Sequence, residues 1–164
     1  MLKKLIFASL CIFPVCVFAN PIEIKGAFGY EFGQKIDVTK IESFDVQPGF
    51  GLMIPVNPSS PVPEYFKEYS IIASIKSFQI VMITASKKYS SDKQCLSKKN
   101  KLLSIFEKTY GSESLNKEES KFIVKGSNGK IDVRCKNSIL LSMYIDNNMG
   151  DKAIAEWRTL NDKK

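Results

Sequence analysis

Two cysteines, Cys95 and Cys135, place the strongest single constraint on how this chain can fold. The other two of its four cysteines, Cys11 and Cys16, lie in an apolar segment at the N-terminus. If that segment is removed on export, the remaining pair enters an oxidising compartment, where one intramolecular pairing is open to it. We therefore predict a Cys95–Cys135 disulfide, which would stabilise the fold by about 4 kcal/mol in the chain-entropy model.

Residues 1–19, MLKKLIFASLCIFPVCVFA, have the layout of a secretory signal peptide. Lys3 and Lys4 precede an apolar run, which ends at the small residue Ala19 that a signal peptidase requires. The run is interrupted by a proline and is shorter than the roughly 20 apolar residues of a membrane-spanning helix. We expect cleavage between Ala19 and Asn20, a periplasmic or secreted product, and no membrane span.

Removal of these 19 residues leaves 145, a length that suits a single domain over residues 20–164. It takes away two lysines and no acids, so the formal charge falls from +7 to +5. A mild basic excess in an exported chain does not indicate a nucleic-acid partner. It fits anionic lipid, cell-wall polymer or an acidic protein instead.

The N-terminal part of this domain alternates between apolar and small residues. From residue 21 to residue 33 this pattern predicts one extended strand, with Phe28, Tyr30 and Phe32 on the same side. The glycine spacing in IKGAFGYEFGQ is G-x-x-G-x-x-x-G, which matches neither the dinucleotide-binding pattern nor the P-loop. We interpret these glycines as strand ends and a point of close backbone approach, not as a phosphate-binding loop.

Residues 34–64 are irregular, with a proline-rich loop over 48–63 that a short strand near 50–56 interrupts. Two longer strands follow, YFKEYSIIAS and FQIVMITASKKY. The second is almost entirely apolar from Ile80 to Ala85, so it should lie in the centre of a sheet.

The stretch SSDKQCLSKKNKLLSIFEKTYG predicts a helix with Ser91 as its N-cap, Gln94 in a capping box, and Gly111 at its end. One face of this helix is apolar and includes a cysteine: Cys95, Leu102, Leu103, Phe106 and Tyr110. Lys99 interrupts that face. We expect its stem to lie on apolar surface while its ammonium reaches water, the alternative being a buried lysine with a shifted pKa.

The stretch KFIVKGSNGKIDVRC predicts a β-hairpin that turns at Asn128-Gly129, with Ile131, Val133 and Cys135 facing inward. A further strand over 139–145 is apolar on both faces, so it should be covered on both sides or pack on the N-terminal segment. Asn148 then caps a C-terminal helix. This order of elements predicts an α+β fold: a single antiparallel sheet, two helices packed on one of its faces, and one disulfide.

The absence of histidine removes the commonest general base, the Ser-His-Asp and Cys-His arrangements, and the usual zinc sites. Neither catalytic, cofactor-binding nor metal-binding residues are predicted. Paired carboxylates could still hydrolyse a glycosidic bond. No spacing singles out a pair from the available acids, Glu31, Glu42, Asp45, Glu64 and Glu68.

A second candidate surface is aromatic. Seven aromatic residues fall in the first half of the chain: Phe28, Tyr30, Phe32, Phe50, Tyr65, Phe66 and Tyr69. Exposed together they would form a patch for a partner protein or a sugar polymer, whereas alternation at period two favours a place in the core for at least half of them.

The segments FKEY, QIVMITA, IDVRC and LLSMYID, together with a cysteine in a helix that ends TYG, resemble a group of small secreted proteins from proteobacteria. This resemblance implies an exported α+β domain with one disulfide. It carries no activity and no catalytic residue to this chain.

We therefore expect an exported, non-enzymatic binding protein whose partner is another envelope or secreted protein, such as an inhibitor or immunity protein. The alternative is a carboxylate-dependent hydrolase of envelope polysaccharide, with two acids in a cleft and a raised pKa on one of them. A third option is contact with anionic lipid through Lys98, Lys101 and Lys108 of the first helix, although a solvated helix face explains the same lysines.

Overall fold

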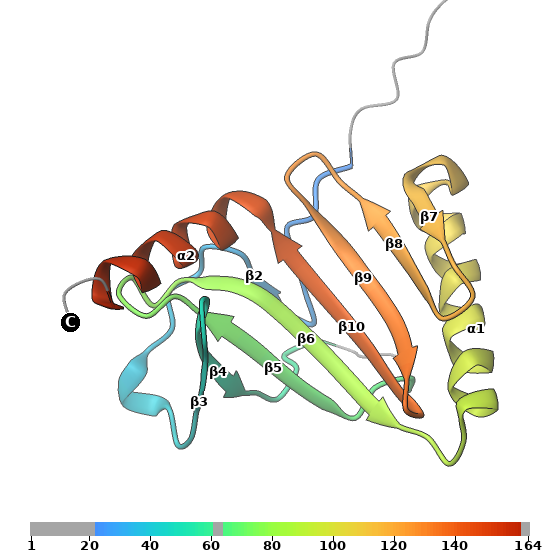
Figure 1. Ribbon diagram of the computed structural model, residues 1–164, viewed down its shortest axis with the longest axis horizontal. Coiled ribbons are helices and arrows are strands. Elements are labelled where there is room, and N and C mark those ends of the chain that lie inside the picture. Colours follow the sequence, from blue (N-terminus) through green and yellow to red (C-terminus); the bar gives the residue numbers. More distant parts are fainter. Residues whose placement is uncertain (1–21, 61–63, 162–164) are drawn as a thin grey trace, which may run out of the picture.

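The computed structural model describes residues 22–60 and 64–161 (Figure 1). The expected signal peptide, its Ala19–Asn20 cleavage position and residues 61–63 of the proline-rich loop lie outside the described residues. The strands of the main sheet are β3 (Asp45–Gln47), β4 (Gly51–Pro55), β5 (Glu68–Ala73), β6 (Ile80–Lys88), β7 (Leu115–Lys117), β8 (Lys121–Lys125), β9 (Gly129–Lys136) and β10 (Ile139–Asp146).

These eight strands form one antiparallel sheet in the order β3-β4-β5-β6-β10-β9-β8-β7. The order describes two four-stranded meanders, β3 to β6 and β7 to β10, which meet where β10 pairs with β6. Helix α1 (Asp92–Tyr110) connects them by carrying the chain from the centre of the sheet to its far edge (Figure 1). The α+β class and the central place of β6 are as predicted.

A second, two-stranded sheet shows that the expectation of a single sheet was wrong. Strands β1 (Gly26–Ala27) and β2 (Tyr30–Glu31) pair with each other around a turn at Phe28-Gly29, where the two φ angles are 56° and 87°. The predicted strand over 21–33 therefore folds back on itself. The turn places the ring of Phe28 against Phe66, Tyr69 and Tyr144, with centroids 5.1 to 6.0 Å apart. Aromatic burial of this kind offsets the strain of a left-handed phenylalanine.

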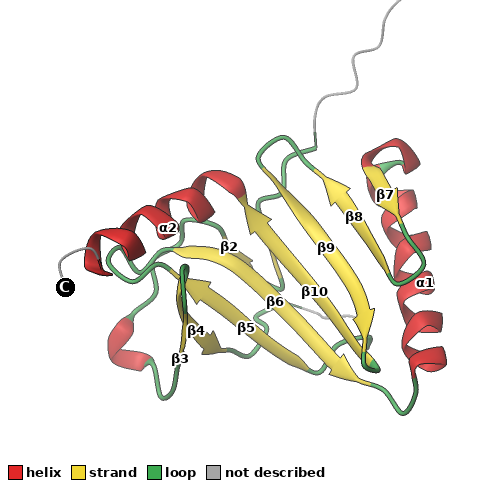
Figure 2. Ribbon diagram, viewed as in Figure 1, coloured by secondary structure: helices red, strands yellow, loops and turns green. Residues whose placement is uncertain are grey.

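The two helices lie against opposite faces of the sheet, and the prediction of a shared face was wrong (Figure 2). Residues of α1 belong to the same core cluster as Ile71, whereas Ala153 of α2 (Asn147–Asn161) packs with Ile72. Because neighbouring residues of a strand point to opposite faces, Ile71 and Ile72 assign each helix to its own side. We call the face with α1 and the β1–β2 hairpin the back, and the other face the front.

Helix α1 has the predicted N-cap and the predicted end, but the side chain of Gln94 accepts the N–H of Ser90 and not that of Ser91, as a capping box requires. The Oγ of Ser91 accepts the N–H of Gln94, and Gly111 follows the last turn with a φ of 77°. Helix α2 differs, because Asp146 and not Asn148 caps it: Oδ1 of Asp146 accepts the N–H of Met149 at 2.9 Å. The helix starts directly after β10, so the last residue of the strand supplies the cap.

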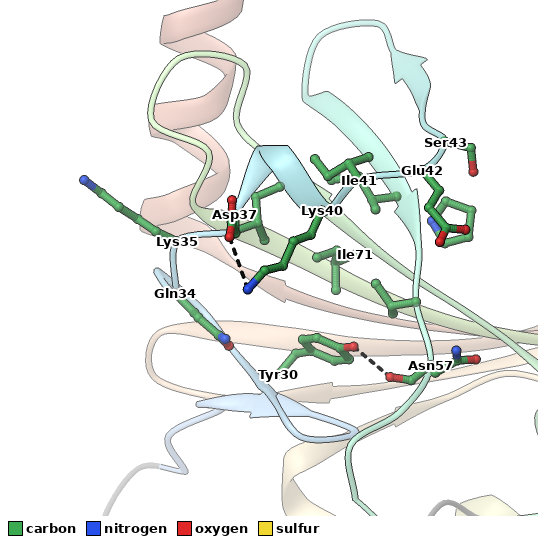
Figure 3. A pocket seen from close by; sticks show the side chains of 14 residues that line it. Tyr30, Gln34, Lys35, Asp37, Lys40, Ile41, Glu42, Ser43, Asn57 and Ile71 are labelled. Atoms are coloured by element: carbon green, nitrogen blue, oxygen red, sulfur yellow. Dashed lines mark hydrogen bonds and ion pairs between the residues drawn. The ribbon is translucent and has the colours of Figure 1, made fainter.

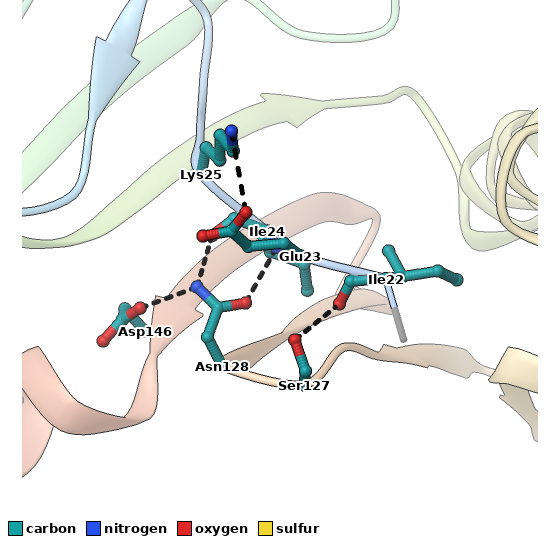
Figure 4. A network of polar contacts seen from close by, with 7 residues as sticks. All are labelled: Ile22, Glu23, Ile24, Lys25, Ser127, Asn128 and Asp146. Carbon is teal, nitrogen blue, oxygen red and sulfur yellow. Dashed lines mark hydrogen bonds and ion pairs between the residues drawn. The ribbon is translucent and has the colours of Figure 1, made fainter. Parts of the chain in front are cut away.

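The β8–β9 hairpin is present, but its turn is shifted by one residue from the prediction. Gly126 donates its N–H to the carbonyl of Gly129, which leaves Ser127 and Asn128 at the tip, neither of them with a positive φ. The Asn128 side chain is instead bonded to the N-terminal segment (Figure 4). The next hairpin turn, Asn137-Ser138 between β9 and β10, does have two positive φ angles.

The predicted disulfide is present. Cys95 in the first turn of α1 is bonded to Cys135 in β9, with the two Cα atoms 6.0 Å apart. The half of the sheet that the second meander forms is thereby cross-linked to the helix that covers it. β7 was not predicted, since the three residues of Leu115–Lys117 are too few to show an alternation.

Candidate functional site

A pocket of about 710 Å³ lies on the back of the sheet, at its β3–β4 end (Figure 3). Its floor is aliphatic and is formed by Ile54 of β4 and Ile71 of β5, which pair across the two strands and are nearly fully buried. The segment 34–43 forms its outer wall. The pocket is therefore a gap between the sheet and one loop that passes over it.

Backbone bonds to the start of β6 hold this loop in place. The carbonyl of Gln34 accepts the N–H of Ile80 at 2.9 Å, and Ile36 donates to the carbonyl of Phe78 at 3.0 Å. A short 3-10 turn, η1 (Val38–Lys40), follows and has Asp37 as its N-cap. The wall of the pocket is thus hydrogen-bonded to the start of the central strand, and Asp37 caps the 3-10 turn within the wall.

The rim of the pocket carries both signs of charge. Lys40 Nζ lies 3.3 Å from Asp37 Oδ2, and both the N–H and the hydroxyl of Thr39 donate to Asp37. These hydrogen bonds, together with Lys40, hold the pKa of Asp37 below its usual value. Opposite this wall the Tyr30 hydroxyl donates to the carbonyl of Asn57 at 2.7 Å, and burial raises the pKa of Tyr30.

The loop that forms the wall continues into an exposed apolar segment. Six large apolar side chains are exposed among the described residues, and three of them lie within nine residues: Val38 (44% exposed), Phe44 (54%) and Val46 (51%). Val46 pairs with Leu52, which is on the same face of β4 as the pocket floor. Exposed apolar side chains concentrated beside a cavity are typical of a binding surface.

The five acids proposed from the sequence do not come together. Glu42 is the one that lines the pocket. The other four are exposed elsewhere: Glu31 in β2, Asp45 in β3, Glu64 near Lys98, and Glu68 bonded to Ser86.

The second carboxylate in the pocket is Asp37, which the sequence-based choice missed. The sequence feature that could have indicated Asp37 is its position two residues before a threonine, a spacing at which an aspartate can act as an N-cap. Figure 3 shows Asp37 and Glu42 at opposite ends of the wall, with Lys40 and Ile41 between them.

The seven aromatic residues considered as a patch or as core are largely core. Phe66 and Tyr69 are buried, and the other five aromatic residues of that group are half-buried. The exposed aromatic residue of this region is Phe44, which the sequence-based choice did not include. No alternation marks Phe44, because it lies in the irregular chain just before β3.

Lys99 does not reach water, contrary to the expectation. It is 2% exposed, and its ammonium donates to the carbonyls of Glu119 at 2.6 Å and Glu118 at 3.3 Å. Burial lowers its pKa. The turn before β8 folds over α1 and replaces water as the partner of this ammonium, so Lys99 fastens that turn to the helix.

Within residues 22–60 and 64–161 no three cysteine or carboxylate side chains are grouped as a metal would require. None of the helices there has the length and apolar character needed to cross a bilayer.

Comparison with known proteins gives no match for this chain: no family model, no curated protein and no solved structure matches it. Its function has to be argued from its own geometry.

Proposed function

We propose that this protein is an exported, non-enzymatic binding protein that holds a partner protein at the pocket and along the adjoining segment 38–46. The exposure of Val38, Phe44 and Val46 carries the proposal. Leaving three large apolar side chains in water costs free energy, which a partner that covers them would recover. Exposed aromatic side chains such as Phe44 are also frequent anchors in protein interfaces.

The chemistry of the pocket favours a protein as the occupant. Its isoleucine floor suits an aliphatic side chain, and its rim offers Lys35 and Lys40 beside Asp37 and Glu42. A partner can therefore insert an apolar residue and place polar groups of either charge around it. Another envelope or secreted protein is the partner we propose, and a role as inhibitor or immunity protein would fit a small fold that acts through a surface.

A carboxylate-dependent hydrolase remains the alternative, because Asp37 and Glu42 both line the pocket. The lowered pKa of Asp37 is unfavourable for a general acid, which needs a raised pKa to stay protonated, so Asp37 would have to be the base or nucleophile of such an enzyme. Asp37→Asn and Glu42→Gln test this point. Hydrolysis of an envelope polysaccharide by the parent protein, lost in either variant, would replace the binding proposal with the hydrolase.

The binding proposal is tested with Phe44→Ser and Val46→Ser, which change exposed side chains. Ile105→Ser in α1 and Leu160→Ser in α2 are matched controls, since these two residues are 46% and 41% exposed and lie in other elements. Immobilised parent protein and controls should retain the same envelope protein from a periplasmic extract. The two test variants should lose it.

Each other outcome of this experiment counts against part of the proposal. Equal retention by all five proteins would move the binding site away from segment 38–46. Failure of the parent protein to retain any protein would contradict the binding function itself. Export is tested separately by N-terminal sequencing of the secreted chain, which should begin at Asn20.

A further inference from the structure

The front of the sheet is covered at one end only. Helix α2 packs there over Ile72 and Met82 through Ala153. In Figure 1 no helix and no loop passes in front of the middle of β5, β6, β10 and β9. In α+β proteins one face of an antiparallel sheet can face water, and such a face is then normally polar.

This face is not polar along β10. Four residues of β10 point to the front and form what we call the β10 stripe: Ile139, Leu141, Met143 and Ile145. Ile139 is 40% exposed and the other three are half-buried. On the back of the same strand Leu140, Ser142 and Tyr144 are buried. Ile145 packs against the cluster that α2 covers, so the part of the β10 stripe that the chain itself leaves open runs from Ile139 to Met143.

Lysines stand at both ends of the β10 stripe. Lys88 of β6 and Lys136 of β9 pair with Ile139, so they flank one end. At the other end Lys130 pairs with Ile145, and Lys125 of β8 pairs with Lys130. All four lysines are exposed, and among the described residues no ion pair involves them.

Three carboxylates in the vicinity of the stripe already have partners. Asp92, at the Ile139 end, accepts the N–H and the hydroxyl of Ser138. Asp132, which pairs with Met143, is buried beneath the guanidinium of Arg134 and is bonded to it. Glu68 lies farther out, in β5, and accepts the hydroxyl of Ser86 at 3.1 Å. The charge that this face offers to a partner is therefore positive at both ends of an apolar line.

We propose that the front face is a second binding surface, and that its occupant is an acidic amphipathic helix of a partner protein lying along β10. The open part of the stripe runs about 13 Å up to α2, so a helix of about 14 residues, about 20 Å long, would cover it and reach beyond its open end. An apolar helix face would cover the stripe, and carboxylates near the helix ends would meet the lysines. This surface is separate from the pocket on the back, so the inference does not depend on the site of the proposed function.

Charge and shape argue against other occupants. A second copy of this chain, docked face to face, would bring like-charged lysines together at both ends of a symmetric interface. A bilayer is flat, whereas Leu141 and Met143 are half-buried and Ile145 lies beside α2. A helix can pack on this face and supply the second layer of secondary structure that the sheet lacks there.

The test uses a stapled helical peptide of about 14 residues with a leucine face and glutamates on its flanks. Two further peptides serve as controls, one with the same composition in scrambled order and one with lysine in place of glutamate. The glutamate peptide should bind the oxidised protein saturably, less tightly at high salt, and should shift the backbone amide resonances of β6, β9 and β10. The two control peptides should not.

Protein variants locate the site. Leu141→Glu should weaken binding by about tenfold or more. Lys130→Glu, which changes an exposed side chain, should weaken it even if Leu141→Glu does not fold. Lys101→Glu, at an exposed position of α1 on the back, is the matched control and should bind like the parent.

Several results would overturn the proposal. These are no saturable binding of the glutamate peptide, equal binding of the lysine peptide, or resonance shifts at the pocket in place of β10. Binding to vesicles of anionic phospholipid without binding to the peptide would assign the face to a membrane. Concentration-dependent dimerisation that Leu141→Glu abolishes would assign it to a second copy.

Discussion

The side chain of Asn128 pairs with the backbone of Ile24 on both of its polar groups. Oδ1 accepts the Ile24 N–H at 2.8 Å, and Nδ2 donates to the Ile24 carbonyl at 2.8 Å (Figure 4). The same Nδ2 donates to Asp146, the residue that caps α2. The side-chain amide of Asn128 therefore makes the two backbone hydrogen bonds that a neighbouring strand would otherwise make with Ile24. It also links the N-terminal segment to the start of α2.

Replacing Asn128 by aspartate should destabilise the protein. The change keeps the shape but removes the donor, so a carboxylate faces the Ile24 carbonyl and the Asp146 carboxylate. We expect a loss of about 1–3 kcal/mol in the free energy of unfolding, measured by urea titration. The Ile24 amide should also exchange its hydrogen faster.

Ser127→Ala provides the control at the neighbouring residue. Its backbone N–H still donates to the Ile22 carbonyl after the hydroxyl is gone, so little stability should be lost. Equal effects of the two substitutions would contradict a specific role for the Asn128 amide.

Removal of the Cys95–Cys135 bond should lower stability more than any single hydrogen bond. The bond closes a loop with a sequence separation of 40, which corresponds to about 4 kcal/mol in the chain-entropy model. The Cys95→Ala/Cys135→Ala double variant should therefore unfold at a clearly lower urea concentration. Mass spectrometry without reductant should detect the bond in the parent, and an unchanged midpoint would show that the cross-link adds no stability.

Substitutions of Lys99 separate its packing from its charge. Lys99→Ala removes a buried stem, and the cavity should cost about 2–4 kcal/mol. Lys99→Met keeps the volume and relieves the burial of a charge while it loses two hydrogen bonds, so stability should change by about 1 kcal/mol or less.

Both Lys99 variants should loosen the turn before β8. Its Ser120 carbonyl accepts the N–H of Cys135 at 2.8 Å, so hydrogen exchange at Cys135 should become faster. If Lys99→Met lowers the free energy of unfolding as much as Lys99→Ala, the bonds to the carbonyls, and not the packing, are the larger contribution.

The protein should lose stability as the pH rises above about 10, because Tyr144 is buried. Burial raises its pKa, so above pH ~10 the phenol ionises in the unfolded chain while it stays protonated in the fold. Stability is thus retained below that pH and falls as pH rises, by up to about 1.4 kcal/mol per pH unit. In urea titrations at pH 8 and 11, Tyr144→Phe should lose less stability between the two values than the parent. Parallel losses would contradict this assignment.

The sequence was informative wherever a local pattern had the length of a whole element. The apolar run in β6, the cap at Ser91 and the alternation in β9 each carry their signal within one element. Burial of one face enforces such patterns at every second or every third to fourth residue. The disulfide could be predicted because two of the four cysteines lie in the expected signal peptide, which leaves one pairing for the other two.

The candidate site was not predictable in this way, since it depends on contacts between distant segments. Phe28 lies in a turn and packs against Tyr144, a residue that is distant in the sequence. Phe44 is exposed because no other segment covers the chain just before β3 at that position. The β10 stripe has an alternation, but alternation cannot tell a covered face from an open one. Only the placement of both helices reveals which face stays uncovered.

The two-meander topology also decides the order in which this chain can fold. Within each meander the paired strands follow one another directly, so each half can form through short loop closures. Joining β6 to β10 requires closure of a much longer loop, and non-local pairings of this kind are slow to form. The reduced chain should therefore pass through an intermediate in which the C-terminal half-sheet exists with the β10 edge unpaired, the point at which misassociation with another unfinished molecule would begin. The Cys95–Cys135 bond shortens the path from β6 to β10 and should make this intermediate shorter-lived.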